Sequence, residues 1–226
     1  MTIRGLIFDF DGLILDTETP CFQSWQEEFQ RNHVSLTLET YAKCLGTSPD
    51  TFDLAAVLSD MTGKTFDNQK LRAAQRQRER ELVLEQEILP GVLDYLAEAK
   101  SRKLKLAVAS SSERTWVHHH LERLGLQQYF DAIFTADDVP HAKPDPALYN
   151  VSLSALQLKP EEVIAFEDSP NGIAAARAAA IYCVAIPNQI SRQLDLSHAS
   201  RIIPSLKEIP LQQLIEQTEP ILTPEE

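Results

Sequence analysis

The feature that most constrains the fold is an alternation of short apolar runs with helical segments over the C-terminal part of the chain. From Gly91 onward the apolar runs are LKLAVAS, AIFTA, VIAFED and YCVAI, and a further run lies at residues 3–8. Strands that alternate with helices pair in parallel. We therefore predict an α/β fold with a doubly wound, mostly parallel, Rossmann-like sheet.

Between the first apolar run and the second, the sequence contains helical patterns alone. We expect four helices. The first begins near Pro20, the second ends near Gly46, and the third and fourth run over residues 50–63 and 67–85. Proline at the start and aromatic residues at helical spacing favour the first of them. We therefore predict an inserted α-helical cap domain at residues 17–87, within a Rossmann-like catalytic core formed by residues 1–16 and 88–226.

Composition narrows the class of protein. The chain has 226 residues, 43% of them hydrophobic, with a formal net charge of -12. A negative surface repels nucleic acid and anionic membranes, so we expect neither as a partner. The three cysteines show no metal-binding spacing, no signal peptide precedes the first apolar run, and no run reaches about 18 apolar residues. These features predict a cytoplasmic protein, and we expect a monomer.

Polar side chains follow the apolar runs where the strands should end. They are Asp9 and Asp11, then Ser110 to Ser112, then Lys143 in the segment HAKPDP, and finally Glu167 and Asp168. In open α/β sheets, ligands bind beyond the carboxyl ends of the strands. We therefore expect acids, hydroxyls and a lysine to meet at one edge of the sheet.

Carboxylates that gather at one edge need a cation. Two unit charges about 4 Å apart repel by about 4 kcal/mol at an effective dielectric constant of about 20. Ligands that are all oxygen atoms favour Mg²⁺. The Ser110 hydroxyl, nearby backbone N–H groups and the Lys143 ammonium group suit phosphate oxygens. Together these groups favour phosphoryl transfer through an aspartyl-phosphate.

Four stretches resemble, in order, the four motifs of the haloacid dehalogenase-like (HAD) superfamily. They are DFDGLILDT, VASSS, AKPDP and FEDSPNG. The helical insertion is similar to the small cap of the β-phosphoglucomutase-like and phosphatase subgroup. The resemblance covers nearly the whole chain, and it implies a Mg²⁺-dependent phosphoric monoester hydrolase that acts on a small phosphorylated metabolite, such as a sugar phosphate.

The resemblance also implies a role for each matching residue. Asp9 matches the nucleophile and Asp11 the general acid/base. The phosphate-binding groups are Ser110, the backbone N–H of Ser111, and Lys143. The metal ligands are Asp9, the backbone carbonyl of Asp11, and Asp168, with Glu167 acting through water. The cap positions expected near the substrate are Thr17, Gly46, Thr47 and Ser48, although a linker hydroxyl is an equal explanation for Thr17.

Several of these residues have simpler structural explanations when they are taken singly. Ser111 and Ser112 could cap the helix that follows them, and Ser169 before a proline is a typical helix cap. Lys143 could be an ordinary loop lysine. The ordered set of four motifs, each at a strand end, favours an active site.

Three other features invite a second interpretation. His118 to His120 could hold a metal, but consecutive helical residues point about 100° apart, which favours a solvated helix face. The run from Arg72 to Glu81 favours a solvated helix of mixed charge, with an arginine directed at the ligand as the alternative. Ala180 stands where the family usually has glycine, so we expect this helix to end differently.

Two functions remain open as alternatives to a phosphatase: a sugar mutase and a non-catalytic sensor. Dehalogenases of the superfamily lack the second aspartate of the first motif, so Asp11 favours phosphate esters. The sugar mutases carry a histidine and an arginine where this chain has Cys21 and Pro49, which favours a phosphatase and keeps a β-phosphoglucomutase-like mutase as the alternative. A non-catalytic sensor of phosphorylated ligands is the third possibility, and the intact acid and lysine set speaks against it.

Overall fold

The structure is a computed structural model, and it describes residues 2–44 and 52–222. Its centre is a six-stranded sheet in the order β3-β2-β1-β4-β5-β6, with every pair of neighbouring strands parallel. The strands are β1 (Gly5–Phe8), β2 (Lys105–Ala109), β3 (Ala132–Phe134), β4 (Val163–Glu167), β5 (Tyr182–Ala185) and β6 (Arg201–Ile202). The predicted α/β fold class is confirmed.

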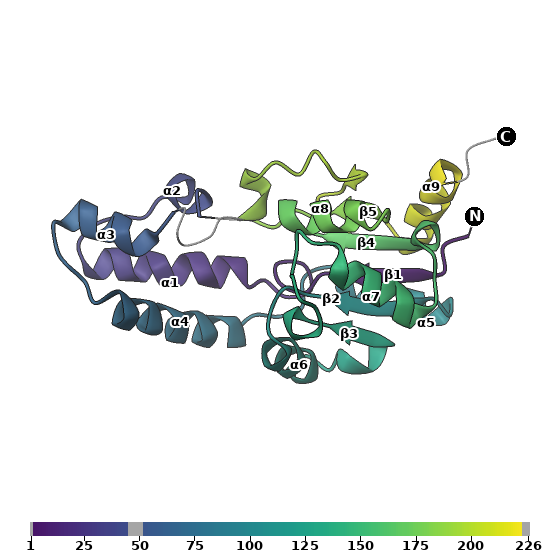
Figure 1. Ribbon diagram of the computed structural model, residues 1–226, viewed down its shortest axis with the longest axis horizontal. Helices are drawn as coiled ribbons and strands as arrows, with labels where there is room; N and C mark the ends of the chain where they lie inside the picture. The colour runs from purple at the N-terminus through teal and green to yellow at the C-terminus, as the bar shows by residue number, and fades with distance from the viewer. Residues whose placement is uncertain (1, 45–51, 223–226) are drawn as a thin grey trace.

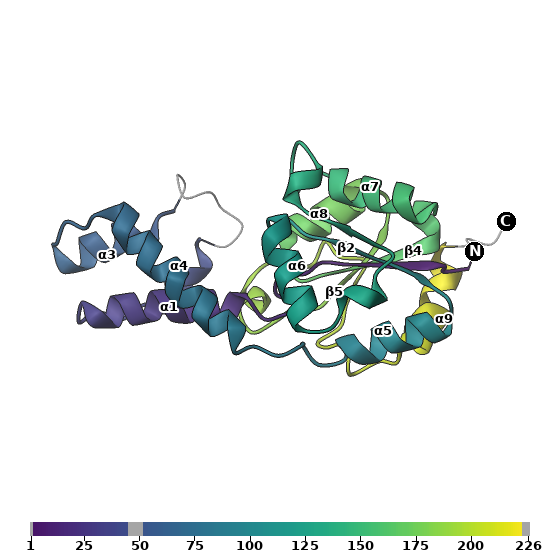
Figure 2. The same cartoon turned by 90° about the horizontal axis from the view of Figure 1, so that it is seen from below.

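Helices cover both faces of the sheet (Figures 1 and 2). On one face lie α5 (Val92–Ser101), α6 (Arg114–Arg123) and α9 (Leu211–Leu222), and on the other lie α7 (Ala147–Leu156) and α8 (Pro170–Ala178). Successive side chains of a strand point to opposite faces. Accordingly Phe8 of β1 packs in the first layer and Ile7 in the second, and both are fully buried.

The strand order fixes where a ligand can bind. The chain runs from β1 outward to β2 and β3 on one side, and β4, β5 and β6 follow on the other side of β1. This reversal leaves a crevice at the carboxyl ends of β1 and β4, the usual ligand site of doubly wound sheets. Asp9 directly follows β1, and Glu167 ends β4.

Four helices lie apart from the sheet (Figure 1). They are α1 (Glu18–Arg31), α2 (Leu38–Ala42), α3 (Leu54–Thr62) and α4 (Asn68–Leu84). They enclose an apolar cluster of their own, which includes Trp25, Phe29 and Leu58. The boundaries that we predicted for the cap, residues 17 and 87, stay a prediction. No helix among the described residues is long and apolar enough to cross a membrane.

The end of α8 differs from our expectation. We expected this helix to end without a residue in the left-handed region, but Ala180 adopts φ 61°. Its N–H donates to the carbonyl of Arg177 at 2.9 Å, and the N–H of Ile181 donates to the carbonyl of Ala176 at 3.0 Å. The backbone therefore makes the turn that glycine usually makes, at a cost of about 1 kcal/mol.

His120, one of three consecutive histidines on α6, contradicts the prediction that these residues form a solvated helix face. His120 is 1% exposed, because helical rotation turns it toward the protein interior. Its ring centroid lies 4.3 Å from that of Trp116 and 6.4 Å from that of Phe10. Its Nδ1 accepts a hydrogen bond from Nε of Arg123 at 3.3 Å. His120 is therefore covered by packing against Trp116 and Phe10 rather than exposed on the solvated helix face that we predicted.

This burial predicts a pH-dependent stability. Burial, with the charges of Arg123 and His119, lowers the pKa of His120 to about 4. An unfolded chain takes up this proton near pH 6.5, so the folded state loses stability as the pH falls from about 6.5 to about 4. In this window the wild type should lose up to about 3 kcal/mol more unfolding free energy than His120→Gln. Urea unfolding at several pH values measures the difference.

His118→Gln is the matched control, because it removes an imidazole from the same helix that does not contribute to the shift at His120. It should reproduce the pH dependence of the wild type. Equal pH dependence in the wild type and in His120→Gln would contradict the prediction.

Candidate active site

A buried lysine lies between two carboxylates at the crevice. Nζ of Lys143 is 2.5 Å from Oδ1 of Asp9 and 2.7 Å from Oε1 of Glu167. The three side chains are 4%, 9% and 0% exposed, so water screens these charges little. Burial alone would lower the pKa of Lys143, but the charges of Asp9 and Glu167 raise it. The lysine is therefore a fixed positive charge.

Glu167 is enclosed by its neighbours. Its Oε1 also accepts a hydrogen bond from the Tyr149 hydroxyl of α7 at 2.5 Å. The first turn of α8 packs directly on it, because a Cβ added at Gly172 would lie 1.8 Å from Oε2. Ser169 caps α8 through its hydroxyl, which accepts from the N–H of Gly172, as the sequence indicated. Glu167 is thus held in one position.

Asp168 is held by a residue that the sequence analysis missed. Nδ2 of Asn188 donates to Oδ2 of Asp168 at 2.7 Å and to the carbonyl of Gly12 at 3.1 Å. Gly12 has φ 77°, and a Cβ at this position would lie 2.3 Å from Oδ2 of Asp168. Asn188 comes soon after β5, so the rule that located polar residues at the other strand ends would have found it too.

The carboxylate cluster suits a divalent cation. Oxygens of Asp9, Glu167 and Asp168 all lie within 4.8 Å of one another, and all three residues are buried. Burial raises the pKa of Asp9 to about 8 although Lys143 opposes it, and burial followed by the charge of Asp9 raises the pKa of Asp168. One lysine does not balance three carboxylates. A set of oxygen ligands with surplus negative charge fits a hard divalent cation.

Asp11 points to a different set of groups. Its Oδ2 accepts from the Ser112 hydroxyl at 2.7 Å and from the Ser110 hydroxyl at 3.2 Å. Its Oδ1 accepts from Nε1 of Trp116 at 2.9 Å. Neither Ser111 nor Ser112 is the N-cap of α6, which is Glu113, so the capping explanation for these serines is wrong.

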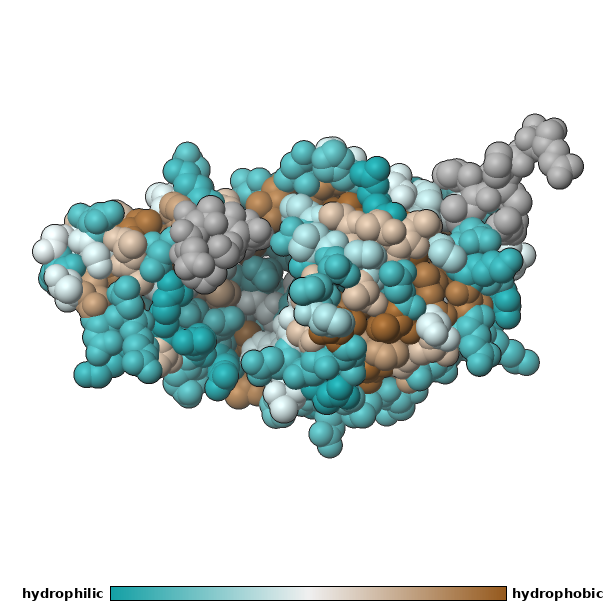
Figure 3. Space-filling model, viewed as in Figure 1, coloured by the Kyte–Doolittle hydropathy of each residue, from teal (hydrophilic) through white to brown (hydrophobic). Residues whose placement is uncertain are grey.

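Two adjoining cavities open at these residues. The smaller, of about 300 Å³, is lined by Asp9, Lys143, Asp168 and the Ser111–Ser112 segment. The larger, of about 790 Å³, lies between the core and the cap helices, where the surface is hollowed (Figure 3). Asp11, Ser111 and Ser112 line both. A ligand could therefore extend from the carboxylate cluster toward the cap.

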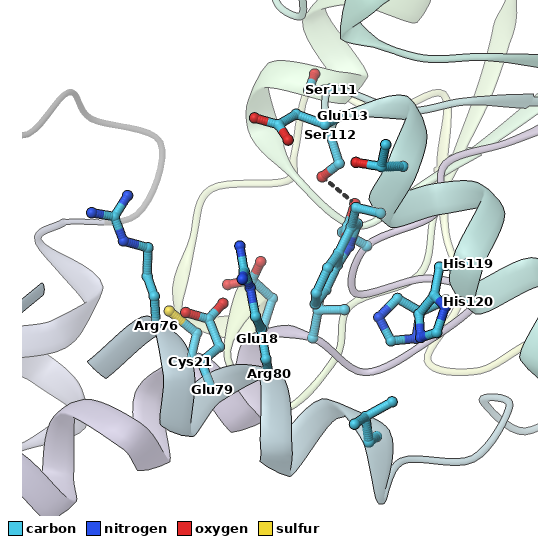
Figure 4. Close-up of a pocket in the computed structure, with 15 residues that line it drawn as sticks. Glu18, Cys21, Arg76, Glu79, Arg80, Ser111, Ser112, Glu113, His119 and His120 are labelled. Carbon is cyan, nitrogen blue, oxygen red and sulfur yellow. Dashed lines mark hydrogen bonds between the residues drawn. The ribbon is translucent and has the colours of Figure 1, made fainter. Parts of the chain in front are cut away.

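The cap lines the larger cavity with polar side chains (Figure 4). They are Thr17, Glu18 and Cys21 from the N-cap and first turn of α1, and Arg76, Glu79 and Arg80 from α4. We expected α4 to be a solvated helix of mixed charge, and much of it is exposed. Two of its four arginines, Arg76 and Arg80, line the cavity, which favours the alternative that this run directs arginines at a ligand. The other cap positions that we predicted, Gly46, Thr47 and Ser48, lie outside the described residues, as does Pro49.

Thr17 lines the larger cavity and has a buried hydroxyl group. It is 5% exposed, and no group of the described residues forms a hydrogen bond with its hydroxyl oxygen. A buried hydroxyl without a partner costs free energy. A ligand with a polar group near Thr17 would remove that cost.

Comparison with known proteins identifies the family. The sequence profile of the haloacid dehalogenase-like hydrolases matches residues 6–186. The chain belongs to this family. The predicted superfamily and the expected class of enzyme, a phosphoric monoester hydrolase, are confirmed.

Individual members of the family show which proteins the chain resembles. It is 39% identical to YhcW of Bacillus subtilis, which carries a provisional phosphatase name, over 95% of this chain and 97% of the relative. It is 32% identical to a phosphatase of phosphorylated carbohydrates from Thermotoga maritima, over 79% of this chain and 82% of the relative. A Thermotoga maritima structure given provisionally as a β-phosphoglucomutase superposes with a TM-score of 0.76 at 26% identity, covering 95% of this chain and 99% of the other.

Proposed function

We propose that this chain is a Mg²⁺-dependent phosphatase that hydrolyses a small phosphorylated metabolite, a sugar phosphate, through an aspartyl-phosphate on Asp9. One observation carries the proposal: the Asp9 carboxylate contacts Lys143 and lies beside Glu167 and Asp168 in a cavity that adjoins the cap. A nucleophile needs an open path to phosphorus and positive charge around the phosphate, and this arrangement offers both.

In the first step, an oxygen of Asp9 attacks phosphorus as the bond to the ester oxygen breaks. Lys143, the hydroxyl of Ser110 and the backbone N–H of Ser111 would hold the phosphoryl oxygens. Lys143 stays charged because Asp9 and Glu167 raise its pKa. The proton of Asp11 would pass to the leaving alkoxide, which departs as an alcohol. Asp11 lies where the two cavities meet, next to the expected position of this oxygen.

In the second step, the carboxylate of Asp11 takes a proton from water, and that water attacks phosphorus. The bond between Asp9 and phosphorus breaks, which returns the Asp9 carboxylate and releases inorganic phosphate. One residue thus serves as acid and then as base, so the proton balance closes over the cycle. Closure of the cap would exclude other water from the phosphorylated aspartate.

The proposed metal ligands are Asp9, Asp168 and the backbone carbonyl of Asp11, with Glu167 acting through water. The carboxylate cluster fits such a cation, as its oxygen ligands and surplus negative charge indicate. When bound, Mg²⁺ would offset the repulsion between the Asp9 carboxylate and the phosphate. Glu167 is bound by Lys143 and Tyr149, which leaves it suited to a supporting position rather than a direct one.

The cap surface supports a hydroxylated substrate. Burial, with the charges of Asp11 and Glu79, raises the pKa of Glu18 to about 7, so this side chain can donate as well as accept hydrogen bonds at neutral pH. Further polar groups come from Glu79, Arg76 and Arg80, and from the Thr17 hydroxyl, which has no hydrogen-bond partner within the described part of the chain. The relative from Thermotoga maritima is named for phosphorylated carbohydrates. These facts support a sugar phosphate over an apolar ester.

A mutase is the second candidate, because the superposed structure carries that provisional name. The mutases have a histidine at the position of Cys21. Burial raises the pKa of the Cys21 thiol, so the thiol stays neutral and cannot replace a histidine in contacts with a charged phosphate. This substitution favours hydrolysis over isomerisation.

A panel of sugar phosphates, assayed for released phosphate with Mg²⁺ and after EDTA treatment, tests the proposal. We expect release from at least one sugar phosphate and a loss of more than about 100-fold after chelation. A further assay supplies glucose 1-phosphate with a trace of glucose 1,6-bisphosphate. Faster formation of the 6-phosphate than of free phosphate would identify a mutase, and no turnover of any ester would favour a sensor.

A further inference from the structure

The indole of Trp116 forms a contact that neither the family motifs nor the proposed mechanism uses. Trp116 lies in the first turn of α6, and its Nε1 donates to Oδ1 of Asp11 at 2.9 Å. The indole packs edge-on against His120, whose buried ring lies behind it with an interplanar angle of 69°. Packing against His120 therefore holds the indole so that its N–H points to Asp11.

The chemistry of this donor limits how the Asp11 carboxyl can be oriented. An indole N–H donates and cannot accept, so Oδ1 of Asp11 must act as an acceptor whenever this bond is present. The partners of Oδ2 are the hydroxyls of Ser110 and Ser112, which can rotate and either donate or accept. The indole contact is therefore the one that fixes the direction of the Asp11 carboxyl.

We propose that Trp116 is a positioning residue that holds the Asp11 carboxyl in the orientation in which it faces the leaving group of a bound ester. This inference rests on the proposed function, since it needs Asp11 to act as the acid. With Oδ1 held by the indole, Oδ2 stays directed at Ser110 and Ser112, in the segment that would hold the phosphoryl group. In the first step Asp11 gives its proton to the leaving oxygen and becomes a carboxylate that still accepts from the indole.

The role predicts a loss that depends on the leaving group. An alkoxide needs a proton in order to leave, whereas p-nitrophenolate leaves readily without one. Trp116→Phe keeps an aromatic ring against His120 and removes the N–H. For this variant, kcat/KM with benzyl phosphate should fall about 10- to 100-fold, because general acid catalysis is impaired. With p-nitrophenyl phosphate, kcat/KM should stay within about threefold of wild type.

The chain offers a matched control. Trp25 is its other tryptophan, buried in the apolar cluster of the cap. Trp25→Phe makes the same chemical change away from Asp11, so the ratio of the two kcat/KM values should remain that of the wild type. In the Asp11→Asn background the acid is absent, and Trp116→Phe should then change the ratio by less than about twofold.

The outcomes separate the two proposals. A substitution that merely disturbs folding lowers both kcat/KM values alike, so an unchanged ratio in Trp116→Phe overturns the inference whatever the absolute loss. A changed ratio that persists in the Asp11→Asn background also overturns it, because the indole would then act elsewhere. If the wild type hydrolyses neither of these esters nor any sugar phosphate of the panel described above, the proposed function itself fails, and this inference fails with it.

Discussion

Asp9→Asn is expected to lower kcat by at least about 10⁴-fold with every phosphate ester. The amide is close in shape to the carboxylate but carries no negative charge, so it cannot form the phosphorylated intermediate. Quenching the wild type with acid during turnover of a ³²P-labelled ester should leave label on the protein, and the variant should carry none. The proposed nucleophile is thereby tested directly, separately from substrate binding.

The same substitution should leave the fold intact. Asp9 is one of three clustered buried carboxylates, and burial already raises its pKa to about 8. An uncharged side chain at this position relieves repulsion, while its amide oxygen can still accept from Lys143. Urea unfolding should therefore give a free energy equal to that of the wild type or above it. The exposed Asp195→Asn is the control. An active Asp9→Asn variant would refute the aspartyl-phosphate mechanism.

The sequence predicted the parts of the fold that depend on local pattern. Five strands were found because each is a short apolar run between helical segments, although β3 is only half-buried. β6 was missed, since Arg201 and Ile202 are too few to show a period and Ile202 is 48% exposed. A strand of two residues owes its pairing to β5 and not to its own composition.

The contacts of the site were harder to predict than its members. Asp9, Lys143, Glu167 and Asp168 could be placed together because parallel strands share a carboxyl edge. Trp116 and Tyr149 lie on helices, and their contacts with Asp11 and Glu167 depend on how α6 and α7 dock on the sheet. Helical periodicity predicts which side of a helix is buried, but it does not predict which buried polar atom a side chain will meet.

Lys143→Met should damage both activity and stability. Lys143 is the charge that contacts Asp9 and Glu167, and all three side chains are at most 9% exposed. Removing one partner of a buried ion pair leaves its acids uncompensated, which typically costs about 3–5 kcal/mol of unfolding free energy. The loss of a phosphate-binding charge should also lower kcat/KM by about 10³-fold or more. Urea unfolding and phosphate release measure the two effects separately.

Divalent cations should partly restore the stability of Lys143→Met, because the remaining carboxylates of Asp9, Glu167 and Asp168 still offer clustered oxygens. The midpoint of thermal unfolding should thus rise more on addition of Mg²⁺ in this variant than in the wild type. The exposed Lys207→Met removes a lysine elsewhere and should behave as the wild type does. If Lys143→Met unfolds at the wild-type urea concentration and gains nothing from Mg²⁺, then the lysine does not compensate the cluster, and the site has no surplus charge for a cation to balance.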